Sequence, residues 1–149
     1  MRHSQPAAQT FMMVVAIFMT LAAPVARGQS RMSDKDIEET MQNLKNDGKH
    51  FQSSFNSAIG KSTIRKTSQE KDAKALVKTF AQQTDSMHTV FKDSKKADTS
   101  LPGVLDSAQR IDRLLADVPL GDNVTSSWGR VKSELNTLAQ AFNMPAPSQ

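Results

Sequence analysis

The chain has 149 residues, of which 38% are hydrophobic and 23% charged, with six glycines, six prolines and a formal net charge of +4. This length suits one domain with a modest core, and the composition is typical of a folded helical protein rather than a disordered one. The lack of cysteine excludes disulfides, thiolate zinc sites, iron–sulfur clusters, c-type haem, a cysteine nucleophile and an N-terminal lipid-anchored cysteine.

The first 28 residues have the features of a secretory signal peptide. Arg2 and His3 give a short basic start, residues 11–23 form an uncharged apolar run, and residues 26–28 supply small side chains for a signal peptidase. The apolar run has about 13 residues, fewer than the roughly 20 that a membrane-spanning helix needs. We therefore expect cleavage after Gly28, export to the periplasm or cell exterior, and no integral membrane segment in the mature chain.

Removing residues 1–28 takes away two arginines, so 17 Lys and Arg then face 15 Asp and Glu and the net charge falls to +2. This near balance gives no support for nucleic-acid binding. Basic residues are in local excess at Lys61, Arg65, Lys66, Lys71, Lys74 and Lys78. Because Glu70 and Asp72 lie among them, the pattern favours a solvated helix face over an anion-binding or membrane-surface patch.

The first helix is expected from Ser33, a suitable N-cap followed by acidic residues, to a stop near Gly60. Its apolar seam, the row of residues spaced by three and four positions that faces a core, is Ile37, Met41, Leu44, Gly48, Phe51, Phe55 and Ala58. A glycine inside this seam weakens the helix, so Gly48 predicts a close approach by a bulky neighbour.

The second helix is expected between Ser62 and Lys96. Its seam is Ala73, Val77, Phe80, Thr84, Met87 and Phe91, and Leu76 widens it. Residues 62–72 are poor in apolar side chains, and only Ile64 among them is expected to be buried. This part of the helix therefore either projects beyond the core or is not helical, so that the helix begins later.

The third helix begins at Leu101, with Pro102 in its first turn, and is expected to be the shortest of the four. Its apolar residues are Leu101, Val104, Leu105, Ala108, Ile111, Leu115 and Val118. Pro119 and Gly121 then break the chain.

The fourth helix is expected to be capped by Asp122 or Asn123 and to end by Asn143. Its seam is Val124, Trp128, Val131, Leu135, Leu138 and Phe142. Two prolines follow, so we expect residues 144–149 to be a flexible C-terminal tail.

Four such seams joined by short connections predict an all-α, antiparallel up-down-up-down four-helix bundle over residues 29–143. A three-helix arrangement with a broken second helix is the structural alternative.

The last two helices resemble a pattern found in uncharacterised exported helical proteins of soil bacteria. The matching residues are Ile111-Asp112-Arg113 followed by Trp128-x-x-Val131-x-x-x-Leu135-x-x-Leu138-Ala139-x-Ala141-Phe142. The resemblance covers about a quarter of the chain. It implies an exported helical protein, and it carries over no activity and no functional residue. Proteins of this kind often end the pattern in an aromatic residue with a hydroxyl group, whereas this chain has Phe142.

A metal or haem inside the bundle is the first chemical alternative. Asp47 and His50, like Asp85 and His88, are spaced by three positions on one helix face, an arrangement that can chelate a metal. If the first two helices fold back around residues 60–63, the two imidazoles lie about 20 Å apart along the bundle, so one site cannot use both.

Haem held by methionine and histidine would use Met41, but the fourth helix supplies no histidine as a second ligand. Met41 and Met87 are therefore expected to be core residues. We predict no metal ligand and no cofactor-binding residue.

Catalytic motifs are missing from the sequence as well. It has no glycine-framed serine, no P-loop and no dinucleotide-binding motif, and Gly60-Lys61-Ser62 reads as a helix stop. Trp128 is expected to be a buried packing residue rather than a binding anchor, and Asp112 to form a solvated charge cluster with Arg110 or Arg113.

We therefore predict a non-enzymatic structural or protein-interaction module of the cell envelope. The alternative is a small-molecule, haem or metal carrier that uses the bundle core. A third hypothesis, an envelope chaperone or inhibitor, differs from the first only in its partner.

Overall fold

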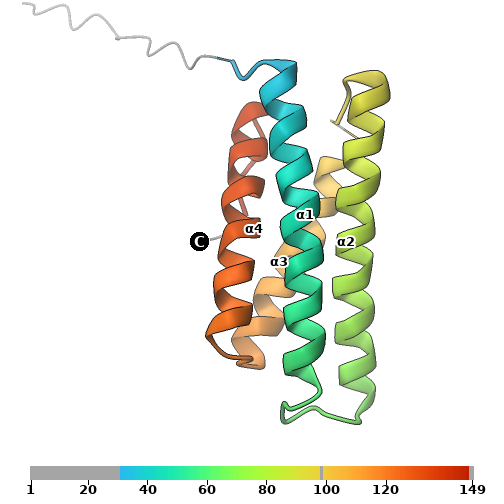
Figure 1. Ribbon diagram of the computed structural model, residues 1–149, viewed down its shortest axis with the longest axis vertical. Helices are drawn as coiled ribbons and strands as arrows, with labels where there is room; N and C mark the ends of the chain where they lie inside the picture. Colours follow the sequence, from blue (N-terminus) through green and yellow to red (C-terminus); the bar gives the residue numbers. More distant parts are fainter. Residues whose placement is uncertain (1–30, 98, 148–149) are drawn as a thin grey trace, which may run out of the picture.

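The computed structural model describes residues 31–97 and 99–147, which form four helices. They are α1 (Asp34–Ile59), α2 (Ser68–Ser94), α3 (Leu101–Asp117) and α4 (Asp122–Ala141). Successive helices run in opposite directions, and α1 packs against both α2 and α4 while α3 closes the bundle against α2 and α4 (Figure 1). The predicted all-α four-helix bundle is confirmed, and the three-helix alternative is wrong. The expected signal peptide and its cleavage site lie outside the described residues.

The beginning of α1 is fixed by a capping box. The Ser33 hydroxyl accepts a hydrogen bond from the backbone N–H of Asp36 at 3.2 Å, and the Asp36 carboxylate accepts one from the backbone N–H of Ser33 at 3.2 Å. The two hydrogen bonds satisfy donors that the first turn of a helix leaves free. The Ser33 hydroxyl also donates to the Asp36 carboxylate at 2.7 Å. This hydrogen bond, and then the one from the Ser33 backbone N–H, lower the pKa of Asp36. Ser33 is the N-cap that its position before an acidic turn predicts.

The core consists of the four predicted seams. Its largest fully buried side chains are Phe51, Phe55, Phe80, Phe91, Met41, Leu44, Ile59, Met87, Leu101, Ile111, Leu135 and Leu138. Ile64 is also buried, as expected. Three predicted seam residues, Ala58, Leu115 and Phe142, are only partly buried, and at the end of α1 the buried residue is Ile59 instead of Ala58. Met41 and Met87 are completely buried core residues.

Gly48 lies where α1 and α2 approach closely. A Cβ atom at this position would lie 3.4 Å from the Thr84 Oγ1 atom and 3.7 Å from the Phe80 Cε1 atom. Gly48 and Thr84 are both buried, and the Thr84 hydroxyl donates to the backbone oxygen of Ala81 at 2.9 Å. The predicted close approach by a bulky neighbour is therefore found, with Phe80 as that neighbour.

The connection between α1 and α2 extends beyond residues 60–63, because the second helix begins late, which was one of the two alternatives for residues 62–72. Residues 60–67 form a series of turns, and α2 begins only at Ser68, with Thr67 as its N-cap. The fold-back point therefore moves toward the C-terminus. Lys45 pairs with Asp85 at 2.6 Å, whereas the expected register would have placed Lys45 opposite Lys78.

The two ends of α4 also differ from expectation. Gly121, at φ 88°, occupies the N-cap and offers no side-chain hydrogen bond, so neither Asp122 nor Asn123 is the cap. At the other end Asn143 adopts a left-handed conformation, and its N–H donates to the carbonyl of Gln140. Asn143 thus begins a Schellman motif in place of the usual glycine.

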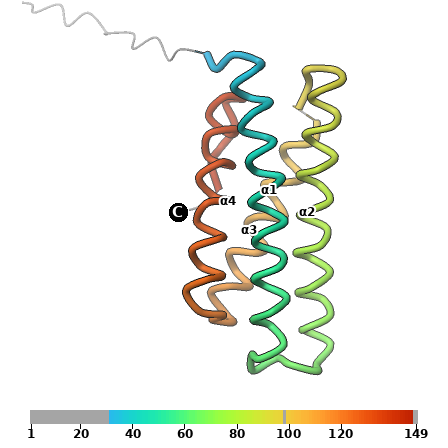
Figure 2. The backbone as a smooth tube through the Cα atoms, viewed as in Figure 1, coloured from blue at the N-terminus to red at the C-terminus, as the bar shows by residue number. Residues whose placement is uncertain are grey.

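The segment after α4 contacts the bundle instead of extending away from it. The backbone N–H of Met144 donates to the carbonyl oxygen of Ala139 at 2.8 Å, which completes the Schellman motif. The chain then reverses along α4 (Figure 2), where Met144 packs against the core and Pro147 is buried. Residues 144–147 are therefore part of the packed unit, because the cap directs them back onto the bundle.

Candidate functional site

The α1–α2 turn extends beyond the rest of the bundle. α1 and α2 have 26 and 27 residues, whereas α3 and α4 have 17 and 20, and the turn that joins the longer pair projects past the α3–α4 turn at the same end (Figures 1 and 2). This end of the molecule is therefore reachable from several directions.

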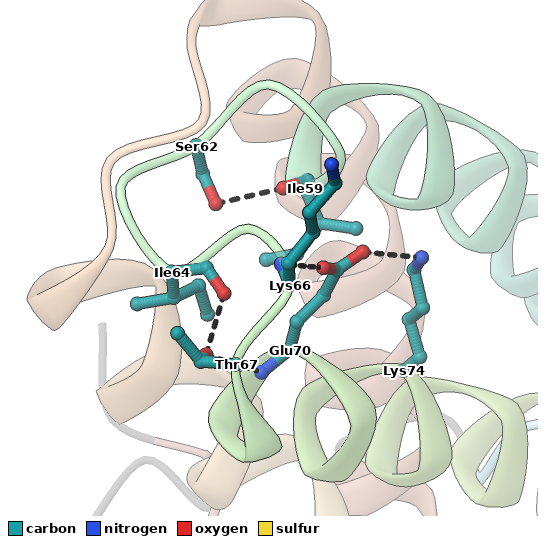
Figure 3. A network of polar contacts seen from close by, with 7 residues as sticks. All are labelled: Ile59, Ser62, Ile64, Lys66, Thr67, Glu70 and Lys74. Carbon is teal, nitrogen blue, oxygen red and sulfur yellow. Dashed lines mark hydrogen bonds and ion pairs between the residues drawn. The ribbon is translucent and has the colours of Figure 1, made fainter.

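Local hydrogen bonds hold this turn in one conformation (Figure 3). The Ser62 hydroxyl donates to the Ile59 carbonyl at 2.7 Å, and the Thr67 hydroxyl donates to the Ile64 carbonyl at 2.5 Å. Thr67 also accepts from the backbone N–H of Glu70 at 3.3 Å as the N-cap of α2. The Ile64 side chain is buried beneath these contacts, so the turn is anchored to the core.

Glu70 joins the turn to the first turn of α2. Its carboxylate accepts hydrogen bonds from the backbone N–H of Lys66 and from the Nζ of Lys74, both at 2.5 Å (Figure 3). Lys66 has a φ of 63°, a left-handed conformation that costs energy for a residue with a side chain. The hydrogen bond from Lys74, and then that from Lys66, lower the pKa of Glu70. The negative charge of Glu70 is therefore engaged by hydrogen bonds within the turn and the first part of α2.

The cations of this region are concentrated on an ordered surface. Residues 61–78 contain six Lys and Arg and two acidic residues, a net charge of +4, whereas the chain from residue 29 onward carries only +2. The remainder of that chain is consequently net negative, at −2. Five of the six cations are exposed, and four of these lie in the turn or in the first turn of α2: Lys61, Arg65, Lys66 and Lys71. We call these four the basic tip. The basic tip therefore carries a local excess of positive charge, in a chain whose remainder from residue 29 onward is net negative.

A groove of about 500 Å³ lies beside the basic tip. We call it the turn groove, and it is lined by Ser54, Ser57, Ala58, Lys61, Ser62, Pro119, Leu120, Asn123 and Val124. Its walls combine apolar side chains with hydroxyl groups, one amide and one cation. Four elements contribute: the end of α1, the α1–α2 turn, the α3–α4 turn and the start of α4. Sequence reasoning missed this groove because its two halves are about 60 residues apart in the chain.

A second groove, of about 470 Å³, lies between the start of α1 and the end of α2, at the opposite end of the bundle. It is lined by Lys35, Glu38, Glu39, Gln42, His88, Lys92 and Lys95. Its central cation and anion pair with each other, since Lys95 Nζ lies 2.7 Å from the Glu38 carboxylate and lowers the pKa of Glu38. Because every residue that lines this groove is polar or charged and two of them already pair with each other, it is a weaker candidate for a binding site.

The two acid–histidine pairs of the sequence do not come together. His50 is exposed on α1, and His88 lies in the second groove. In the observed register they are about 10 Å apart along the bundle, at about 1.5 Å per residue, rather than the expected 20 Å. No group of three or more metal-binding side chains occurs among residues 31–97 and 99–147. Asp85 instead pairs with Lys45, whose hydrogen bond lowers the pKa of Asp85.

Trp128 lies at the centre of the core. It is 3% exposed, and its ring centroid lies 4.7 Å from that of Phe51 and 5.5 Å from that of Phe80. Its indole N–H donates to the Asp112 carboxylate at 2.7 Å, and Lys132 approaches the same carboxylate at 3.5 Å.

The predicted burial of Trp128 is therefore confirmed. The expected pairing of Asp112 with a neighbouring arginine is wrong, because the indole and Lys132 draw its carboxylate across to α4.

One acidic residue has a pKa shifted in the opposite direction. Burial of the Glu134 side chain on α4, and then the nearby carboxylate of Asp47 on α1, raise the pKa of Glu134. The two carboxylates thus repel each other across the α1–α4 contact, and this weak point does not coincide with either groove.

Comparison of the chain with protein-family models, with curated proteins and with solved structures finds no match. The resemblance to exported helical proteins of soil bacteria therefore stays a prediction from the residues that carry it. None of the helices described here has an apolar stretch long enough to cross a bilayer. The turn groove and the basic tip are therefore the candidate binding sites of this protein.

Proposed function

We propose that this protein is an exported, non-enzymatic interaction module of the cell envelope that binds a protein partner through the turn groove. The observation that carries the proposal is the composition of that groove. Apolar walls from Ala58, Pro119 and Leu120 lie next to hydroxyl groups and Lys61. Protein interfaces likewise combine apolar side chains with hydrogen-bonding groups.

The construction of the groove also supports binding. One wall belongs to α1 and a turn that hydrogen bonds and the buried Ile64 hold in place. The other wall includes Val124, which is buried in the core. A surface with this support is ordered before a partner arrives, so less conformational entropy is lost on binding. A partner segment with a small apolar side chain next to a carboxylate would match the apolar walls and Lys61.

The competing hypothesis, a carrier with its ligand in the core, would need space or ligands at the seam positions. Those positions hold buried side chains, including Met41, the methionine considered as a haem ligand. Support for the interaction module is therefore stronger.

A photo-crosslinking amino acid placed at Ser57 tests the proposal. Ser57 is exposed and lines the turn groove, and Ser133 on α4 is an exposed serine outside it that serves as the matched control. We expect irradiated host cells to give a discrete crosslinked protein from position 57 and not from position 133. The purified partner should then bind the unmodified protein and lose affinity for Ser57→Arg, which fills the groove. Equal crosslinking from both positions, or none from either, would contradict the proposal.

A further inference from the structure

We propose that the basic tip docks this protein on an anionic phospholipid bilayer, with the long axis of the bundle pointing away from the membrane. The proposal goes beyond partner binding in the turn groove and rests on a different observation. That observation is the concentration of the positive charge on one projecting, ordered turn.

Position is the first argument. The α1–α2 turn extends past the α3–α4 turn, so a flat surface approaching this end of the molecule meets the tip first (Figure 1). Lys61, Arg65, Lys66 and Lys71 are all exposed there. A lipid surface is extended and flat, and a projecting end can contact it without any concave fit.

Charge is the second argument. Segment 61–78 carries +4 while the rest of the chain from residue 29 onward carries −2. A molecule with this asymmetry is oriented by an anionic surface, because the tip is attracted and the remainder is repelled. Two acidic residues lie in this segment. Glu70 is held by Lys74 and by the Lys66 backbone, and Asp72 is exposed next to Lys71, so four cations face one free carboxylate at the tip.

The lack of apolar anchors distinguishes a bilayer from a protein as the occupant of the tip. Tight protein interfaces depend on buried aromatic or large aliphatic anchors. Among the described residues the only large hydrophobic side chain that is exposed is Val90, 43% exposed and close to the far end of α2. Ile64, the apolar residue of the turn, points into the core. Electrostatic adsorption to lipid headgroups needs no such anchor.

The test measures binding of the purified exported protein, with its N-terminus determined by mass spectrometry, to sedimented lipid vesicles. Vesicles of phosphatidylglycerol mixed with phosphatidylcholine are compared with vesicles of phosphatidylcholine alone. We expect binding only to the anionic vesicles. It should disappear as salt rises from about 0.1 M to about 1 M, because the screening length falls from about 10 Å to about 3 Å.

Two triple variants then separate the tip from net charge. The tip variant is Arg65→Gln, Lys66→Gln and Lys71→Gln. The control is Arg110→Gln, Arg113→Gln and Arg130→Gln, three exposed cations on α3 and α4. Both variants lose the same charge. Each cation at an anionic surface contributes about five-fold to binding, so the tip variant should bind about 100-fold more weakly. The control should change by only a few-fold. Circular dichroism checks that both variants fold.

Three results would overturn the proposal. Equal losses in the two variants would show that net charge rather than the tip is responsible. Binding to neutral vesicles, or binding that persists at high salt, would indicate apolar insertion. A protein that ignores anionic vesicles but binds polyglutamate through the tip would assign the tip to an acidic protein partner instead.

Discussion

Replacement of Trp128 gives the sharpest test of the packing described above. Removing a large buried aromatic side chain costs about 3 to 5 kcal/mol. Trp128 is 3% exposed and packs against Phe51 and Phe80, so Trp128→Ala should fall within that range. A domain of this size is stabilised by about 6 to 17 kcal/mol in total, so the loss is large but need not prevent folding.

The hydrogen bond from the indole to Asp112 can be separated from the packing. Hydrogen bonds to charged groups contribute about 1.5 to 3 kcal/mol, and the lower end applies because the Asp112 side chain is 24% exposed. Trp128→Phe keeps most of the ring contacts and removes the donor. In a double-mutant cycle, Asp112→Ala should therefore show a coupling of about 1 to 2 kcal/mol with Trp128→Phe. The contact with Lys132 is lost in both backgrounds and cancels.

The assay is urea unfolding followed by circular dichroism, because the variants lack the only tryptophan and fluorescence cannot be compared. A loss below about 1 kcal/mol for Trp128→Ala would mean that the side chain is not buried as described. A coupling near zero would mean that the indole and Asp112 do not interact in solution.

Three further predictions concern stability. In urea unfolding, Gly48→Ala should leave the free energy of unfolding unchanged or raise it by up to about 1 kcal/mol. Alanine favours the helix, and its Cβ would meet the Thr84 Oγ1 atom at 3.4 Å, an ordinary contact. Gly48→Leu should lower the free energy of unfolding, because the larger side chain would overpack against Phe80. Thr67→Ala should cost about 1 kcal/mol through loss of the α2 N-cap, and Ser100→Ala, at an N-cap with no side-chain hydrogen bond, is the matched control that should cost less. Glu134 has a raised pKa, so the folded state holds the proton of this carboxyl more tightly than the unfolded state does, and stability is lost as pH rises through that pKa. Glu134→Gln should therefore be more stable than the parent protein at pH 7. This difference in stability should vanish below pH 4.5, the ordinary glutamate pKa. Equal effects of the two cap variants, or a Glu134→Gln advantage that persists in acid, would show these assignments to be wrong.

The helices and the core could be predicted from the sequence because the spacing of apolar residues in each seam indicates both the helix and its buried face. Spacings of three and four residues identified the buried faces of all four helices, and Ser33 followed by acidic residues gave the start of α1. The start of α2 could also have been found, since Thr67-x-x-Glu70 has the spacing of a capping box. Reading Ser62 as the start instead shortened the turn and shifted the α1–α2 register.

The turn groove and the Asp112–Trp128 hydrogen bond could not be predicted in the same way. Both depend on side chains from different helices meeting, and the spacing within one helix carries no information about that. The ordered segment 144–147 depends on Asn143 adopting a left-handed conformation, which asparagine tolerates but its presence alone does not require. The local excess of cations was visible in the sequence, but its position on a projecting turn was not.

Native mass spectrometry, with metal analysis and an absorption spectrum, tests the central claim most directly when the protein is purified from the envelope of its own host. Our account predicts the mass of the bare polypeptide, beginning near residue 29, with no metal and no chromophore. A bound haem, metal or small molecule would contradict the interaction module in favour of a carrier, and would make Met41, His50 and His88 the residues to replace.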